Sequence, residues 1–340
     1  MSQLGQTEKN CEHIFSLSPQ TRTWLNAGGM SQVPSNGHRA NAVTRAKAIL
    51  WFFLYGGMAY LSQVEAILNR SFKGSALPMT EPQIRFDDGA SYERMMGAWS
   101  RLAGDVFLDW LKPGSGLRWV DVGCGNGAFS ELVVQRFAPA LLQGVDPSEA
   151  QLNYARTRPG ARTADFQLGD AMALPFPNDS FDVAVMALVI FFVPDPAKGV
   201  AEMARVVRPG GEVAAYVWDI IGGKGAAAPI ESEMRAMGLT PPRPPSFEAS
   251  RIEALRELWS DAGLDAIETR EIMVQRTFND FDDFWTTTLL IPTLGPTFAA
   301  MPPKDAELLK TRVRARLPAD AAGRITYEAR ANAVKGRMPE

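Results

Sequence analysis

The stretch from 119 to 129, WVDVGCGNGAF, most constrains how this chain can fold. An apolar run reaches an acidic residue, Asp121, and then opens into a turn with glycine at alternate positions, Gly123, Gly125 and Gly127. Glycine has no β-carbon, so it adopts a positive φ and lets a ligand approach the backbone. The pattern predicts a buried strand, a tight turn, and a helix whose first N–H groups face a ligand. Such turns bind adenosine-containing cofactors.

The turn alone fits two classes of enzyme, because Gly123, Gly125 and Ala128 also satisfy the looser dinucleotide pattern GxGxxG/A. A second predicted strand, 141–145, is followed by Asp146, about twenty residues after the turn. A carboxylate there can accept hydrogen bonds from both hydroxyls of a ribose. Dehydrogenases and methyltransferases share this arrangement, so the choice between them depends on the residues further downstream.

Two downstream segments separate these classes, GDAMALPFPNDSFDVAV at 169–185 and DPAKGVAEMARVVRPGG at 195–211. With the glycine turn and Asp146, they make the chain resemble the class I S-adenosylmethionine-dependent methyltransferases, in particular the broad group around the quinone-biosynthesis C-methyltransferases. The resemblance is firm from 117 to 217 and looser toward the C-terminus. It implies S-adenosyl-L-methionine as cofactor and methyl transfer to a small-molecule acceptor by in-line displacement.

The resemblance also implies which residues bind the cofactor. They are Asp121, Gly123, Gly125, Gly127, Asp146, Pro147, Asp170, Ala171, Met186 and Ala187. Asp121 and the glycines would bind the methionine end, and Asp146 the ribose. Asp170 and the backbone of Ala171 would bind the adenine amino edge, while Met186 and Ala187 would line the methyl side. Carboxylates around the site suit a cofactor with a sulfonium and an ammonium group better than they suit a pyrophosphate.

Short apolar runs alternate with helical patterns after 117, which predicts an α/β fold with a doubly wound, mostly parallel, Rossmann-like sheet of seven strands. The expected strands are 117–122, 141–145, 164–168, 181–186, 212–217, 266–274 and 325–334, the last antiparallel. The expected helices are 126–137, 148–158, 196–207 and 251–263. Ligands of such sheets bind at the C-terminal ends of the strands.

Two segments are candidates for the acceptor side. Apolar residues at helical spacing from 91 to 111 predict a lid helix over the cofactor mouth, with Tyr92 as the candidate lid and acceptor-side residue. The segment 278–318 is too long for a hairpin and rich in aromatic residues, which predicts a helical cap insertion over the substrate. Core packing is the alternative explanation for each aromatic residue.

The composition divides the chain into an N-terminal extension, 1–78, and a methyltransferase domain, 79–340. Met79 begins a stretch typical of this methyltransferase group, so we also consider the hypothesis that translation starts there. The apolar run 48–61 has fourteen residues, fewer than the roughly 20 that span a bilayer. A packed or interfacial helix is therefore expected rather than a membrane span, and contact with a membrane through this run is the less favoured alternative.

The two histidines, His13 and His38, lie outside the resemblance, so neither a histidine base nor a histidine-ligated metal is expected. Relatives frequently carry a histidine after the fourth strand, where this chain has Phe191 and Phe192. An acceptor that is already ionised, Tyr92 or a carboxylate are the remaining ways to handle a proton. The catalytic residues are not identified by the sequence, and no metal is predicted.

A net charge of -3 and the lack of a basic stripe disfavour nucleic acid as a partner. Two cysteines do not make a disulfide framework and fit a reducing cytoplasm. Two alternative functions stay open: a sensor or subunit that binds the cofactor without catalysis, and a nicotinamide-dependent oxidoreductase. The sequence identifies neither the acceptor nor the oligomeric state.

Overall fold

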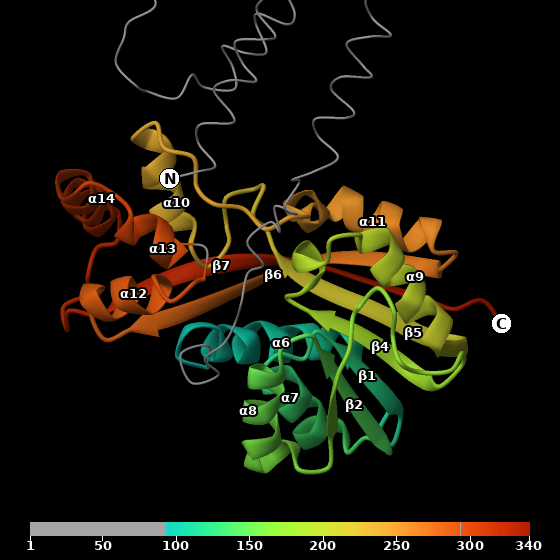
Figure 1. Ribbon diagram of the computed structural model, residues 1–340. Coiled ribbons are helices and arrows are strands. Elements are labelled where there is room, and N and C mark those ends of the chain that lie inside the picture. Colours follow the sequence, from blue (N-terminus) through green and yellow to red (C-terminus); the bar gives the residue numbers. More distant parts are fainter. Residues whose placement is uncertain (1–92, 293) are drawn as a thin grey trace, which may run out of the picture. The chain divides into compact units, whose positions relative to one another are not determined.

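The computed structural model describes residues 93–292 and 294–340, which form a seven-stranded sheet flanked by helices (Figure 1). The strands are β1 (Arg118–Val122), β2 (Leu141–Asp146), β3 (Asp165–Leu168), β4 (Phe181–Ala187), β5 (Val207–Trp218), β6 (Asp265–Phe278) and β7 (Ile325–Arg337). Their order is β3-β2-β1-β4-β5-β7-β6. Only β7 runs antiparallel to its neighbours. The predicted doubly wound, mostly parallel sheet with an antiparallel last strand is confirmed.

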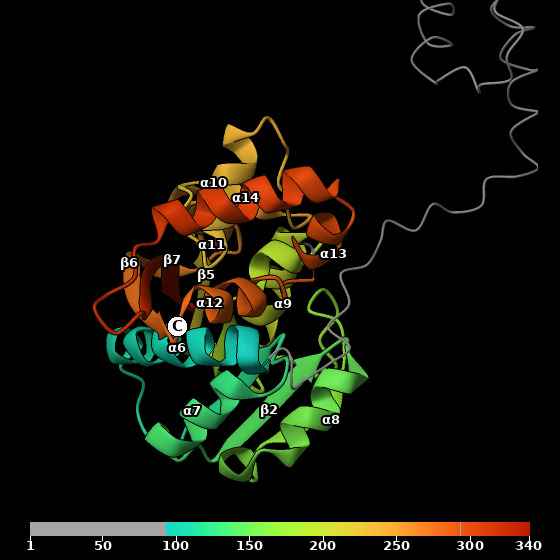
Figure 2. The same cartoon turned by 90° about the vertical axis from the view of Figure 1, so that its left-hand side faces the viewer.

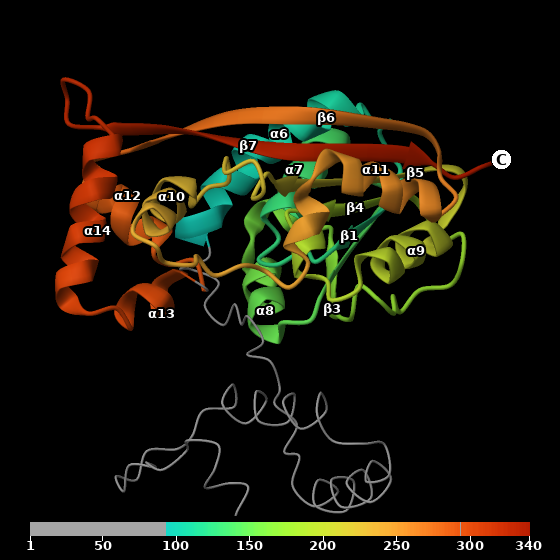
Figure 3. The ribbon, with the colours of Figure 1, turned by 90° about the horizontal axis from the view of Figure 1, so that it is seen from above.

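Helices cover both faces of the sheet. On one face lie α6 (Ala98–Leu111), α7 (Ala128–Phe137) and α8 (Glu149–Thr157), and on the other lie α9 (Pro196–Val206) and α11 (Ile252–Asp261) (Figures 1 and 3). Short helical turns are η2 (Glu93–Gly97), η3 (Pro159–Ala161), η4 (Ile190–Phe192) and η5 (Phe247–Ser250). The chain runs from β1 outward to β3 and then crosses back to β4. The strand order therefore reverses between β1 and β4, where ligands of such sheets bind.

Four helices gather at the end of the sheet where β6 ends (Figures 1 and 2). They are α10 (Ala228–Ala236), α12 (Phe281–Thr288), α13 (Leu294–Ala299) and α14 (Pro303–Arg316). The insertion 278–318 is thus helical, as expected, whereas α10 was not anticipated. Glu233 of α10 is buried and forms ion pairs with Arg312 and Arg316 of α14. A buried carboxylate needs such partners, so these ion pairs hold the two helices together.

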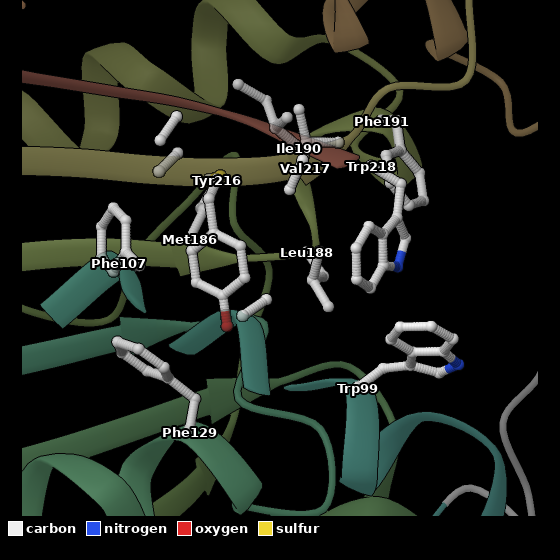
Figure 4. Packing of buried hydrophobic residues seen from close by; sticks show 14 of the residues in the cluster. Trp99, Phe107, Phe129, Met186, Leu188, Ile190, Phe191, Tyr216, Val217 and Trp218 are labelled. Atoms are coloured by element: carbon white, nitrogen blue, oxygen red, sulfur yellow. The ribbon is translucent and has the colours of Figure 1, made fainter. Parts of the chain in front are cut away.

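Aromatic side chains fix α6 across β5 (Figure 4). The ring centroids of Phe107 and Tyr216 are 4.7 Å apart, and Trp99 meets Trp218 edge-on at 5.7 Å. Phe129 of α7 completes the group at 5.9 Å from Tyr216. Aromatic rings contribute much of the apolar area buried in a core. Because Trp218 is the last residue of β5, the start of α6 is held at the C-terminal edge of the sheet.

Most element boundaries agree with the predictions, but those of four elements differ. β5 begins at Val207 rather than 212, because Val207 already pairs with Phe181 before a register shift. The β6 and β7 strands are longer than expected and pair along their whole length, up to Phe278 opposite Ile325. The lid helix opens with the π-helical turn η2 before α6 begins.

Several predictions concern residues outside the described part of the chain. These are the extension 1–78 with its apolar run 48–61, the hypothetical start at Met79, and the lid candidate Tyr92. In residues 93–292 and 294–340, no helix combines the length and the hydropathy needed to cross a membrane.

Candidate functional site

The glycine turn after β1 has the conformation that its sequence predicts. Gly123, Gly125 and Gly127 have φ values of 76°, 51° and 77°. A β-carbon on Gly123 would lie 2.5 Å from a methyl carbon of Val189, and a β-carbon on Gly127 would lie 3.0 Å from the β-carbon of Ala155. Glycine at these two positions is therefore required by the turn's own conformation and packing, independently of any ligand.

Asp121 is a buried carboxylate with one oxygen that lacks a hydrogen-bond partner among the described residues. Its side chain is 1% exposed, and the hydroxyl of Ser130 donates to Oδ2 at 2.6 Å. Its other oxygen, Oδ1, is buried and has no hydrogen-bond partner among the described residues. Burial raises the pKa of Asp121 to about 7; the Ser130 hydrogen bond opposes this shift and the charge of Asp146 adds to it. A buried acceptor normally has a donor, so Oδ1 is suited to the ammonium group of a ligand.

Asp146, the last residue of β2, is bonded to the glycine turn itself. Its Oδ2 accepts from the backbone N–H of Gly125 at 2.9 Å, and its Oδ1 accepts from that of Ser148 at 2.8 Å. Burial raises the pKa of Asp146, and these two hydrogen bonds oppose the shift. An ionised carboxylate has about four acceptor positions, so each oxygen can still accept a ribose hydroxyl. The structure thus shows that Asp146 holds the turn, while its expected contact with a ribose stays a prediction.

The residues expected on the adenine side lie at the surface. Asp170 follows β3 and is exposed, and its Oδ1 accepts from the backbone N–H of Met172 at 2.8 Å. Its other carboxylate oxygen can accept a further donor. Ala171 is half-buried, and Pro147, next to Asp146, is exposed. A flat base could therefore reach this part of the edge without moving the core.

The residues expected on the methyl side lie at the end of β4. Met186 is fully buried, so neither its side chain nor its backbone is exposed at this edge. Ala187 is partly exposed. The next residue, Leu188, has a φ of 64°, an uncommon value for a residue with a branched side chain. Such strain is concentrated at functional sites, which agrees with the expected position of the methyl group.

The sheet brings the expected cofactor residues together along one edge. They lie at the ends of β3, β2, β1 and β4, which are consecutive neighbours. Their roles as cofactor ligands stay a prediction. Sequence reasoning did not anticipate Ser130, although it lies three residues after Gly127 at the start of α7. It also missed Arg158, whose closeness to the turn depends on how α8 packs.

A narrow crevice lies beside this edge, between η2 and α12. Its described lining residues are Met95, Met96, Trp99, Ala226, Thr287, Thr288 and Ile291. None of them has an ionisable side chain. The walls of the crevice are closed against one another, with no room between them for a water molecule, whereas ordinary ligand sites enclose roughly 300–1,000 Å³. Any acceptor would therefore require its walls to move apart.

Tyr327 packs edge-on against Trp99, with ring centroids 6.2 Å apart. Its hydroxyl donates to the carbonyl of Gly225 at 2.9 Å. Burial, with the charges of Glu231 and Glu328, raises the pKa of Tyr327 well above its ordinary value. Tyr327 is therefore not a base at neutral pH.

The chain is similar to known methyltransferases. Residues 120–215 match a family model described as "Methyltransferase domain". A ubiquinone/menaquinone biosynthesis C-methyltransferase of Dinoroseobacter shibae is 37% identical over 123 residues, which are 35% of this chain and 49% of that protein. A 2-methyl-6-phytyl-1,4-hydroquinone methyltransferase of Oryza sativa subsp. japonica is 42% identical over 95 residues, 28% of this chain and 27% of that protein.

A third relative is a fatty-acid O-methyltransferase of Mycolicibacterium smegmatis, 35% identical over 96 residues, 28% of this chain and 35% of that protein. The chain thus spans about half the length, or less, of these curated relatives. The matched family region, 120–215, contains the glycine turn, Asp146 and Asp170. The fold and this match identify a domain of the class I S-adenosylmethionine-dependent methyltransferases in this chain.

Proposed function

We propose that this protein transfers a methyl group from S-adenosyl-L-methionine to a small, largely apolar acceptor. The observation that carries the proposal is Asp121, a buried carboxylate whose Oδ1 has no partner among the described residues. It lies beside a turn with positive φ values and close enough to Asp146 for their charges to interact. This acidic pair would repel a pyrophosphate, so it favours a cationic cofactor over a nicotinamide dinucleotide.

The chain's residues would bind and orient the two substrates. Asp121 would accept the cofactor's ammonium group, and Asp146 would accept its ribose hydroxyls while it holds Gly125 in place. When bound, S-adenosylmethionine supplies a methyl group already activated by its sulfonium. The walls of the crevice would then hold the acceptor in line with that methyl, and such positioning provides much of the rate enhancement in displacements.

The crevice supports an apolar acceptor. Its described lining consists of methionine, tryptophan, isoleucine, alanine and threonine side chains, which favour apolar surface. The names of the three relatives refer to ubiquinone and menaquinone biosynthesis, to a hydroquinone and to fatty acids, all largely apolar molecules with a polar end. With no ionisable group in the described lining, the acceptor arrives ionised or gives its proton to water or to a residue such as Tyr92.

A sensor or subunit that binds the cofactor without catalysis is the second candidate. The same observation favours it, namely a crevice of small volume without an ionisable residue in its described lining. We place either function in the cytoplasm, on the basis of the two cysteines, and without nucleic acid as a partner.

Calorimetry with S-adenosylhomocysteine tests the proposal, with reduced nicotinamide dinucleotide as the competing ligand. We expect the protein to bind S-adenosylhomocysteine. The reduced nicotinamide dinucleotide should not change the affinity of the protein for S-adenosylhomocysteine. Binding of the nicotinamide alone would refute the proposal. Labelling of quinol or fatty-acid acceptors with methyl-labelled cofactor then separates an enzyme from a sensor, which would bind the cofactor and label neither.

A further inference from the structure

The π-helical turn η2 lies between the glycine turn and the crevice, and its first residue is bonded to the glycine turn. The carboxylate of Glu93 accepts from Arg101 at 2.6 Å through Oε1. Its Oε2 accepts from the side-chain amide of Asn126 at 2.9 Å and also from Arg158. Asn126 lies between Gly125 and Gly127, so one carboxylate joins η2 directly to the expected cofactor turn.

The side chain of Arg158 bonds to three parts of the structure, namely the glycine turn, α7 and η2. Its side chain is 7% exposed. Its Nε donates to the carbonyl of Asn126 at 2.5 Å, and Nη1 donates to Glu131 of α7 at 2.9 Å. Its Nη2 donates to Glu93. A buried guanidinium is tolerated only with such partners, so a displacement of the glycine turn must displace η2 or break these bonds.

The charges in this cluster balance. Arg101 and Arg158 oppose Glu93 and Glu131. Burial would raise the pKa of Glu93, but the hydrogen bond and charge of Arg101, with the charge of Arg158, hold it below its ordinary value. Glu93 therefore stays ionised at neutral pH, and its bonds to the glycine turn and to Arg158 persist.

A second arginine holds η2 from the side of the crevice. Arg276 of β6 donates to the backbone carbonyls of Met95 and Arg94 at 2.7 and 2.9 Å. Its guanidinium lies 4.5 Å from the ring centroid of Phe278 and 5.8 Å from that of Trp99. Such cation–π contacts favour a fixed guanidinium. The turn is thus attached on two sides, to the cofactor edge through Glu93 and to the strand that leads into α12 through Arg94 and Met95.

The same turn η2 supplies part of the crevice wall. Met95 and Met96 line the crevice and are 4% and 9% exposed. Methionine adapts its shape to a neighbouring group more readily than branched residues do. A π-helical turn is also rare in helices and is found frequently at functional sites. Any shift of η2 would therefore change the shape of the proposed acceptor site.

We propose that η2 is a coupling segment, through which occupation of the glycine turn orders the wall of the acceptor crevice. Arg158 and Arg276 are its positioning residues, and neither needs to touch the reacting atoms. The inference rests on the proposed function, because it takes the glycine turn as the cofactor site. Coupling of this kind is reciprocal, so an acceptor in the crevice also strengthens binding of the cofactor.

Hydrogen exchange followed by mass spectrometry tests the coupling on the full chain, with S-adenosylhomocysteine as the probe. In the wild type, saturating probe should slow amide exchange in 93–99 by about tenfold, a difference of roughly 1.4 kcal/mol in opening free energy. In Arg158→Met, probe affinity should fall about tenfold or more. At saturation of this variant, the slowing in 93–99 should be lost. Arg276→Met should lose most of the slowing in the same peptides.

Arg136→Met is the matched control. Arg136 of α7 binds Asp105 and Asp109 of α6 at 3.1 and 2.5 Å, so it also joins two helices on this face. Its hydrogen bonds go to neither the glycine turn nor η2. The control removes the same charge, and we expect it to keep both the probe affinity and the slowing in 93–99.

The outcomes separate the coupling from the proposed function. A wild type that does not bind the probe refutes the proposed function and the coupling with it. A wild type that binds the probe without slowing in 93–99 refutes the coupling alone, as does full slowing in Arg158→Met. If Arg158→Met does not fold, the experiment uses Glu93→Gln instead, because glutamine keeps the shape of the Glu93 side chain. That variant should lose at least about half of the slowing, and full retention would refute the coupling.

Discussion

Replacing Asp121 by asparagine should stabilise the ligand-free protein at alkaline pH and weaken cofactor binding. The pKa of Asp121 is raised by burial from 3.8 to about 7 in the folded protein. Above pH 7 the wild type therefore contains a buried carboxylate whose Oδ1 has no partner among the described residues. Asparagine has nearly the same shape as aspartate and no charge, so the variant avoids the free-energy cost of burying an unpaired charge.

The size of the effect follows from the two pKa values. Between 3.8 and 7 the folded state holds a proton that the unfolded state has released, so wild-type stability falls as the pH rises through this window. Each pH unit contributes at most about 1.4 kcal/mol. From pH 5 to pH 8, the free energy of unfolding of Asp121→Asn should thus increase relative to wild type by about 2 to 3 kcal/mol.

Urea unfolding of both proteins at pH 5, 6, 7 and 8 measures this difference, and calorimetry with S-adenosylhomocysteine measures binding. At pH 8, Asp121→Asn should bind the probe about tenfold to a hundredfold more weakly, because a charged hydrogen bond is lost. A stability difference that does not vary with pH would refute the raised pKa. Unchanged affinity would remove Asp121 from the cofactor site.

Asp182→Asn is a control for which the expected pH dependence of stability has the opposite direction. Asp182 lies near the start of β4 and accepts from the backbone N–H of Arg118 and from Arg208. Burial would raise the pKa of Asp182, but these partners hold it below its ordinary value of 3.8. Its contribution to stability is therefore present above pH 3.8 and lost as the pH falls through the lower folded-state value. The variant should be less stable than wild type at pH 7 and keep its affinity for the probe.

Three further predictions concern the site and the helices beyond the sheet. Asp146→Ala should weaken probe binding by about 1.5 to 3 kcal/mol, since it removes charged hydrogen bonds, and unchanged affinity in calorimetry would exclude Asp146 from the site. Gly125→Val should abolish probe binding with the fold largely intact, because its φ of 51° strains a β-branched residue; circular dichroism with calorimetry tests this, and normal binding would contradict it. Glu233→Ala should destabilise the contact of α10 with α14 by about 1 to 2 kcal/mol, since Arg312 and Arg316, which are 41% and 54% exposed, lose their common partner, and limited proteolysis should then cleave α14 faster; an unchanged rate would argue against this role.

The residues at the strand ends could be predicted because their signals are local. A buried strand, an acidic residue and alternating glycines mark the turn after β1, and the same logic marks Asp146 after β2. A parallel sheet brings such ends to one edge, so the expected cofactor residues lie together although they span 121 to 187. The helical character of 278–318 could also be predicted from its pattern. The packing of α10 against α14 could not.

Other features depend on packing between distant segments. Glu93 and Arg158 are 65 positions apart, and no local pattern indicates that they meet at the glycine turn. The sequence places Met186 at the methyl side, yet its full burial follows from how β4 packs. The raised pKa of Asp121 likewise results from burial by neighbouring elements. Tyr92, the lid candidate, lies outside the described residues and stays a prediction.

Transfer of a labelled methyl group from the cofactor to an acceptor tests whether this protein is a methyltransferase. The protein is incubated with methyl-labelled S-adenosylmethionine and a lipid-soluble extract of cells, and the extracted products are separated. The wild type should label a small, largely apolar molecule, and Gly125→Val should label none. Binding of the cofactor without any labelled product would contradict catalysis and leave a cofactor-binding sensor or subunit as the function of this chain.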